Sequence, residues 1–309
     1  MNGTIIRSTS QTRPLTTKIA KQLFIHNVHV NGWEAVIYCH GLSASRYIEY
    51  AGAIAFLLLK IKCRDTILEV GCGHSILPTF WQKFQIVTIV LDTNRNALKW
   101  QARKSKEINN AISCVILADM RNLPLRDQSM MGVSCISALE HIRDNGDVET
   151  ASEIGRILKF GGACVISVPL ALHRSYLKLH WAAEIPPLMQ SLLRPCLPAI
   201  LRKFQVDRTS SYSERFFSLE DIIRRIVVPS RCEIEGRFVL KSGRLTKFIH
   251  QKIIPQGFLS LLEHLIARFL PTSRDIKGGD AIVIDLKKGD LKRKDKIGDK
   301  TLRFVRSEE

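Results

Sequence analysis

The sequence TILEVGCGHS, residues 66–75, decides the fold of this chain. Its first five residues form an apolar run that predicts a buried strand of a parallel sheet, with the acidic residue Glu69 near its end. Gly71 and Gly73 follow, and glycine lets the backbone turn sharply and lets a ligand approach amides that a Cβ atom would shield. Residues 76–84 are typical of a helix. This order of elements predicts a nucleotide-type binding turn at the carboxyl edge of a sheet.

Two kinds of nucleotide site fit this turn. A dinucleotide site has the pattern Gly-x-Gly-x-x-Gly, which requires glycine at position 76, where the chain has Ile76. That pattern also gives Glu69 no role. The pattern Glu-x-Gly-x-Gly instead resembles the turn of class I methyltransferases that depend on S-adenosylmethionine (SAM). A third glycine that is common in that family is replaced here by Ser75.

Acidic residues also end the next two predicted strands. The β-branched run at residues 85–91 ends at Asp92, whose carboxylate can accept hydrogen bonds from two neighbouring ribose hydroxyls. Asp92 would serve NAD as well as SAM, so it supports both kinds of site equally. The run at residues 113–118 ends at Asp119. The methyltransferase resemblance implies that Asp119 accepts the adenine amino group and that the backbone amide of Met120 meets the adenine ring.

The rest of the chain continues the same pattern. A helix carrying Arg-x-Leu-Lys before Gly-Gly, residues 153–162, resembles the "type 11" small-molecule methyltransferases, and this resemblance covers residues 65–170. It implies an α/β fold with a Rossmann-like, seven-stranded, mostly parallel sheet flanked by helices. Further strands are expected at residues 131–137, 163–168, 232–240 and 280–286.

The chain is expected to divide into three regions. Residues 1–60 are an N-terminal extension with a helix that packs on the core. Residues 61–286 are the methyltransferase domain, with helical insertions at about 173–215, after strand five, and at about 247–271, before strand seven. Both insertions are basic and amphipathic, so they can cover an apolar acceptor, contact an anionic membrane surface, or pack on the core. Residues 287–309 mix charges with few large apolar side chains, which predicts a disordered tail.

The composition agrees with a cytoplasmic globular enzyme. The chain has 309 residues and a formal net charge of +17, which favours anionic partners such as a phosphorylated substrate, anionic lipid or nucleic acid. Eight cysteines are present without a Cys-x-x-Cys pair, so neither a zinc site nor a disulfide framework is expected. Cys114, Cys135 and Cys164 fall in predicted buried strands, where cysteine packs as a small apolar residue. The polar N-terminus lacks a secretory signal, and the longest apolar stretch, Ala51–Leu59, is too short to span a bilayer.

The expected site residues divide by role. The resemblance implies a set of cofactor-binding residues: Glu69, Gly71, Cys72, Gly73, Asp92, Thr93, Asp119, Met120 and Ser137. His141 is the best candidate for a catalytic base, because its ordinary pKa lies near neutrality and it follows the fourth strand beside Glu140, a second candidate. His173, after the fifth strand, is a further candidate.

Methyl transfer from SAM to a small, apolar or anionic metabolite is the function that these features favour. Three alternatives stay open. A nucleic-acid (RNA) methyltransferase would explain the charge, but the fourth strand ends in Ser-Ala-Leu-Glu-His and lacks the Asn/Asp-Pro-Pro-aromatic run of enzymes that methylate base amino groups. A non-catalytic SAM-binding subunit would keep the glycine turn, and a nicotinamide oxidoreductase would use Asp92.

Overall fold

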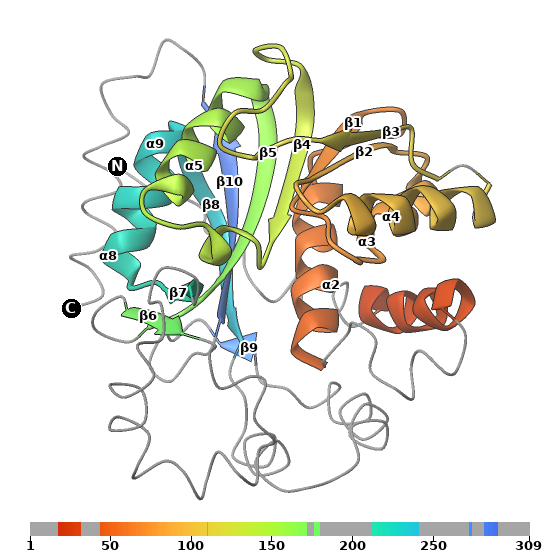
Figure 1. Ribbon diagram of the computed structural model, residues 1–309, viewed down its shortest axis with the longest axis horizontal. Coiled ribbons are helices and arrows are strands. Elements are labelled where there is room, and N and C mark those ends of the chain that lie inside the picture. The colour runs from red at the N-terminus through yellow and green to blue at the C-terminus, as the bar shows by residue number, and fades with distance from the viewer. Residues whose placement is uncertain are drawn as a thin grey trace, which may run out of the picture.

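The fold is given by a computed structural model, which describes residues 18–31, 44–109, 111–171, 176–179, 212–240, 272–273 and 281–289. A twisted eight-stranded sheet runs through the centre of these residues, and helices cover both of its faces (Figure 1). The predicted α/β architecture is therefore confirmed.

The main sheet has eight strands in the order β3-β2-β1-β4-β5-β10-β8-β9. The strands are β1 (Thr66–Val70), β2 (Val87–Asp92), β3 (Cys114–Leu117), β4 (Met130–Ile136), β5 (Leu158–Pro169), β8 (Cys232–Leu240), β9 (Thr272–Ser273) and β10 (Ala281–Lys288). The first five are parallel to one another, and β10 is antiparallel to both of its neighbours, β5 and β8. The two-residue strand β9 at the edge adds an eighth strand to the seven that the sequence predicts.

The order of strands reverses between β1 and β4. From β1 the chain continues outward through β2 and β3, and it then returns to place β4 on the other side of β1. In open α/β sheets such a reversal leaves a crevice at the carboxyl ends of the two strands, and ligands bind there. The glycine turn follows β1 directly, so it lies at this crevice.

Helices form one layer on each face of the sheet (Figure 1). One layer contains a helix over residues 18–31 together with α2 (Ala44–Leu58), α3 (Leu77–Phe80) and α4 (Arg95–Glu107). The other contains α5 (Gly146–Ile157), α8 (Leu219–Ile222), the π-helical turn η3 (Ile223–Val227) and α9 (Val228–Ser230). Two apolar clusters fill the space between these layers and the sheet. Apolar burial on both faces is the reason why the central strands read as continuous apolar runs.

Two predicted helices differ from the structure. The segment expected as a helix over residues 76–84 forms one turn of α3 and then the 3₁₀ helix η1 (Trp81–Phe84). Gln85 ends it with a left-handed φ of 54°, which turns the chain into β2. The helix expected to continue to residue 162 ends at Ile157, and residues 158–162 already belong to β5. Gly161, at φ 77°, lies beside a register shift between β4 and β5, so the glycine pair belongs to an irregular strand start and not to a helix end.

The chain enters the first predicted insertion just after β5, and it returns from the insertion beside the same end of β5. Its described residues form a two-stranded antiparallel sheet, β6 (Tyr176–Leu179) with β7 (Tyr212–Phe216), where the sequence predicted helix. Leu170 bridges Phe217, and the Phe217 carbonyl accepts the Ala171 N–H at 2.7 Å. His173 and the second predicted insertion, 247–271, lie outside the described residues.

Two further predictions concern the C-terminal strand and the lack of a membrane-spanning helix. Strand β10 continues to Lys288, two residues beyond its predicted end, and the remainder of the predicted tail after Gly289 lies outside the described residues. Within the described part of the chain, no helix is long and apolar enough to cross a membrane.

The burial of the cysteines was predicted only in part. Cys135 and Cys164 are buried, but Cys114 is exposed. Strand β3 is an edge strand, and an apolar run does not distinguish an edge strand from a central one.

Candidate functional site

The glycine turn after β1 has a backbone that other residues would strain. Gly71 has a φ of 67° and Gly73 a φ of 47°. The amide of Gly71 donates to the Leu91 carbonyl at 2.9 Å, which fixes the turn against β2. A Cβ atom on Gly71 would stand 2.6 Å from the Cβ of Ala138. The turn therefore packs closely against the loop that follows β4.

Gly73 faces open space. Among the described residues, and apart from its two chain neighbours, no heavy atom lies within 4 Å of the position that its Cβ would take. Its amide donates to Oδ2 of Asp92 at 2.8 Å, and the Asn94 amide donates to Oδ1 at 2.8 Å. Thr93 lies between Asp92 and Asn94 and is exposed. The Asp92 carboxylate thus stands beside the open side of the turn, and its role as a ribose-binding acid stays a prediction.

Glu69 lies within the sheet below the turn. It is buried, and Oε2 accepts a hydrogen bond from the Ser134 hydroxyl at 2.5 Å across the β1–β4 pair. Burial raises the pKa of the Glu69 carboxyl to about 8, although the Ser134 hydrogen bond acts in the opposite direction. At neutral pH this side chain is therefore mainly protonated, and it supports the turn from below. Cys72 is also buried in the turn, where burial raises the pKa of its thiol.

Asp119 already has a cationic partner. Arg121 donates to its carboxylate with a shortest N–O distance of 2.7 Å and also through its backbone amide at 2.9 Å. The hydrogen bond from the Arg121 side chain lowers the pKa of Asp119. Met120 reaches back to the turn, because its Cε lies 3.1 Å from the Cβ position of Gly71. The three acids predicted to converge differ in their surroundings, and their shared contact with an adenosyl group stays a prediction.

Ser137 ends β4 at the same edge. Its φ is 47°, and its amide donates to the carbonyl and to the hydroxyl oxygen of Ser167, at 3.1 and 3.0 Å. Its own hydroxyl donates to Oε2 of Glu49 at 3.2 Å, and Nη1 of Arg46 donates to the same oxygen at 2.8 Å. The sequence pattern did not predict these contacts of Glu49 and Ser167. The signal available for Glu49 was its spacing from Arg46, because the two charged residues lie one turn apart at the start of an otherwise apolar helix.

The two candidate catalytic residues lie in η2 (Leu139–His141), just after Ser137. Glu140 is buried, whereas the His141 side chain is 53% exposed. Nε2 of His141 lies 4.0 Å from Oε1 of Glu140. The pair lies just after the end of β4, at the carboxyl edge of the sheet, and the His141 side chain reaches solvent, while the catalytic role of both residues stays a prediction.

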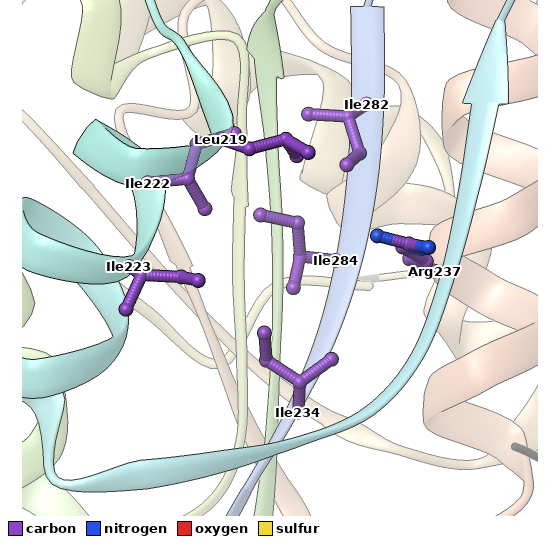
Figure 2. Close-up of a pocket in the computed structure, with 7 residues that line it drawn as sticks. All are labelled: Leu219, Ile222, Ile223, Ile234, Arg237, Ile282 and Ile284. Carbon is purple, nitrogen blue, oxygen red and sulfur yellow. The ribbon is translucent and has the colours of Figure 1, made fainter. Parts of the chain in front are cut away.

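A separate apolar crevice lies between α8 and the sheet (Figure 2). Its lining comes from α8, η3, β8 and β10: Leu219, Ile222, Ile223, Ile234, Arg237, Ile282 and Ile284. Strands β4, β5 and β10 separate β8 from β1 and its glycine turn in the sheet. The crevice is therefore part of the packing of α8 on the sheet, away from the site around Gly73.

The comparison with known families agrees with this geometry. Residues 68–166 match the model of a family described as "Methyltransferase domain". This stretch runs from β1 to β5 and includes every predicted cofactor-binding residue. The chain therefore carries a methyltransferase domain of class I, the class that uses SAM as its cofactor.

One curated relative is an uncharacterized protein of Methanocaldococcus jannaschii. The two sequences are 31% identical over 117 residues, which cover 37% of this chain and 46% of the relative. The match thus spans less than half of the relative's length.

Two solved structures share the fold. A putative sarcosine dimethylglycine methyltransferase from Galdieria sulphuraria is 16% identical, with 88% of this chain and 98% of that chain covered and a TM-score of 0.50. The [4+2]-cyclase SpnF is 13% identical, with 80% and 84% covered and a TM-score of 0.52. Because one of the two is named a cyclase, the shared fold alone does not decide the reaction.

Proposed function

We propose that this chain is an enzyme that transfers the methyl group of SAM to a small acceptor, which is apolar or anionic. The observation that carries the proposal is the open side of Gly73 beside the Asp92 carboxylate, at the point where the strand order reverses. A turn that leaves space where a side chain would stand lets a ligand approach its backbone amides.

The residues at this edge fit an adenosyl ligand. Asp92 uses each carboxylate oxygen once, for Gly73 and for Asn94, and a carboxylate has about four lone-pair sites. It can therefore accept ribose hydroxyls while it still holds the turn. Met120, just after β3, covers the turn near Gly71 and offers an apolar surface to the adenine ring.

SAM supplies a methyl group on a sulfonium, whose sulfur is already activated as a leaving group. The protein has to align the acceptor, hold it at about 3–3.5 Å and exclude water. We assign the base to His141 for a hydroxyl or amine acceptor, because it lies after β4 and is open to solvent, which can remove the proton.

The charge and the insertions support the acceptor class. The chain has a formal net charge of +17, which attracts anionic molecules. The chain enters the first insertion at the carboxyl end of β5, whose Ser167 accepts the Ser137 amide, so the insertion starts at the edge of the sheet where we propose that the acceptor binds. The relative named as a sarcosine dimethylglycine methyltransferase is consistent with a small acceptor.

The experiment has two parts. Thermal unfolding with SAM, S-adenosylhomocysteine (SAH) or NAD should show stabilisation by the first two ligands only. Incubation with methyl-labelled SAM and separate lipid, aqueous and RNA extracts should then place the label in a small molecule. Stabilisation by NAD alone, or label found only in RNA, would contradict the proposal.

Asp92→Asn is the matched variant for the cofactor. It keeps the size of the side chain and removes the charge, so SAH binding should weaken by roughly 10- to 100-fold, since hydrogen bonds to a charged group contribute about 1.5–3 kcal/mol. Unchanged affinity would remove Asp92 from the ribose site.

A further inference from the structure

Strand β3 exposes apolar side chains at the edge of the sheet. Among the described strands it pairs only with β2, so its other edge has no described strand beside it. Val115 is 38% exposed and Leu117 is 49% exposed. Soluble proteins usually protect such an edge with a charged residue, a proline or a bulge. The residues Cys114–Leu117 include neither a charge nor a proline, and they pair with β2 without a register shift, so this edge is open to pairing with another chain.

The exposed side chains of β3 lie on the face of the sheet that α4 covers. Side chains alternate between the two faces along a strand. Ile116 packs against the apolar cluster on the α5 face, whereas Leu98 of α4 packs against Val90 of β2 on the opposite face. Val115 and Leu117, on either side of Ile116, therefore point to the α4 face. Helix α4 leaves both of them partly uncovered.

Four cations lie on one side of α4 and form what we call the basic stripe: Arg95, Lys99, Arg103 and Lys106. Their spacing places all four within about 80° around the helix axis, at about 100° per residue. All four are exposed. Within the described part of the chain, Arg95, Lys99 and Lys106 form no ion pair, and Arg103 has Glu107 at 3.8 Å. The basic stripe therefore carries positive charge that is mostly uncompensated.

The basic stripe lies on the side of α4 that is next to the β3 edge. Another side of the helix faces the N-terminal helix and the glycine turn, because Lys104 Nζ donates to the Val30 carbonyl at 2.6 Å and the rings of Trp100 and His74 meet edge-on at 5.5 Å. Trp100 and Lys104 lie about 100–150° around the helix from the centre of the basic stripe. Helix α4 packs on both β2 and β3 at this end of the sheet (Figure 1). A row of cations therefore flanks the open apolar strand.

We propose that Val115, Leu117 and the basic stripe bind an extended acidic segment of another protein, which adds to the sheet as a strand beside β3. Backbone hydrogen bonds to β3 hold the segment in this mode of recognition. Its side chains on the α4 face are acidic, so their stems cover Val115 and Leu117 and their carboxylates reach the basic stripe.

The charge and the side chains of this surface disfavour two other occupants. A second copy of this chain would bring an identical row of cations to the surface, and like charges repel. A single-stranded nucleic acid would use the cations, but the side chains of Cys114–Leu117 offer its bases no aromatic surface for stacking. An acidic strand satisfies both the open edge and the cations.

The probe for this surface is a fluorescently labelled synthetic peptide of about ten residues that alternates glutamate and valine, the period of a strand. Fluorescence anisotropy with the wild-type protein should show saturable binding that weakens as the salt concentration rises. A matched peptide with proline in place of every valine keeps the charge, but it loses backbone donors and the strand conformation. It should bind at least about tenfold more weakly.

Charge reversal at the basic stripe locates the peptide. Lys99→Glu should weaken its binding by about 5- to 10-fold, because the change removes one attraction and adds one repulsion. Lys62→Glu is the control, since Lys62 is an exposed lysine before β1, at the opposite edge of the sheet. It should leave the affinity unchanged within about twofold.

Four results would overturn the proposal. The wild-type protein could fail to bind the peptide, or it could bind the proline peptide equally well, which would show attraction by charge without strand pairing. Equal affinities of Lys99→Glu and Lys62→Glu would place the peptide elsewhere. Binding of an RNA oligonucleotide or of anionic vesicles in preference to the peptide, if lost in Lys99→Glu, would assign the surface to that partner instead.

Discussion

Replacement of Glu69 by Gln should abolish a loss of stability that the wild-type protein undergoes as the pH rises from 5.5 to 7.5. Gln has the same shape, keeps an oxygen for the Ser134 hydroxyl, and cannot ionise. In the wild-type protein the folded carboxyl has a pKa of about 8, raised by burial from an ordinary value of 4.5. Between these two values the unfolded chain releases a proton that the folded state keeps, so the free energy of unfolding falls as pH rises.

The size of the effect follows from the pKa difference. Each pH unit inside this window costs the wild-type protein up to about 1.4 kcal/mol, so from pH 5.5 to 7.5 the loss is roughly 3 kcal/mol. Below the carboxyl pKa of the unfolded chain, both states bind the proton. Above the pKa of the folded state, both states have lost it. In the Glu69→Gln variant the free energy of unfolding lacks this dependence on pH. Relative to the wild type, it should therefore rise by roughly 3 kcal/mol between pH 5.5 and 7.5.

Urea unfolding of both proteins without ligand, at three pH values between 5.5 and 7.5, measures the difference. Other groups that titrate here, such as His26 and Asp285, are present in both proteins and cancel in it. Glu107→Gln, at an exposed carboxylate, should show a difference that does not vary with pH. A difference between Glu69→Gln and wild type that is equally flat would refute the reasoning.

Four other substitutions test the site and its support. Gly71→Ala should destabilise the protein by about 2–3 kcal/mol in urea unfolding, because its Cβ has no room, and a loss below about 1 kcal/mol would contradict the close packing. Gly73→Ala should cost only about 1 kcal/mol for its left-handed backbone, yet weaken SAH binding in calorimetry by filling the open side; unchanged affinity would argue against a ligand there. His141→Ala should change stability by less than about 0.5 kcal/mol and spare SAH binding while lowering turnover, and a normal rate would remove it from the chemistry. Lys60→Met should leave the buried carboxylate of Asp285 without its main cation and cost about 3 kcal/mol at pH 8. Burial already raises the pKa of Asp285 to about 6, so protonation should reduce the loss at pH 5, and equal losses at both pH values would contradict this.

The glycine turn and the position of Asp92 at the edge of the sheet could be predicted from the sequence because their signals are local. Gly71, Gly73 and Asp92 each follow a strand whose apolar run marks its end, and parallel strands bring their carboxyl ends to one edge. The hydrogen bond that accompanies the burial of Glu69 could not be predicted from the sequence, because its donor, Ser134, lies in another strand 65 residues later.

The contacts around Ser137 and Asp119 were less predictable. Glu49 reaches its place only through contacts with Ser137, which is 88 residues away. The ion pair of Asp119 with Arg121, two residues later, was not predicted from the sequence either. The contact of Asp119 with an adenine amino group stays a prediction. The exposure of Cys114 follows from strand order, and a single run of residues carries no information about strand order.

The chain leaves the core at Ala171 and re-enters it at Phe217, and these two residues are hydrogen-bonded to each other. Just beyond the re-entry, Arg225 of η3 binds both carboxylate oxygens of the buried Asp147 at the start of α5. The segment between Ala171 and Phe217 therefore leaves and rejoins the core at one place. Its replacement by a segment of another length should leave the register of β5, β10 and β8 unchanged.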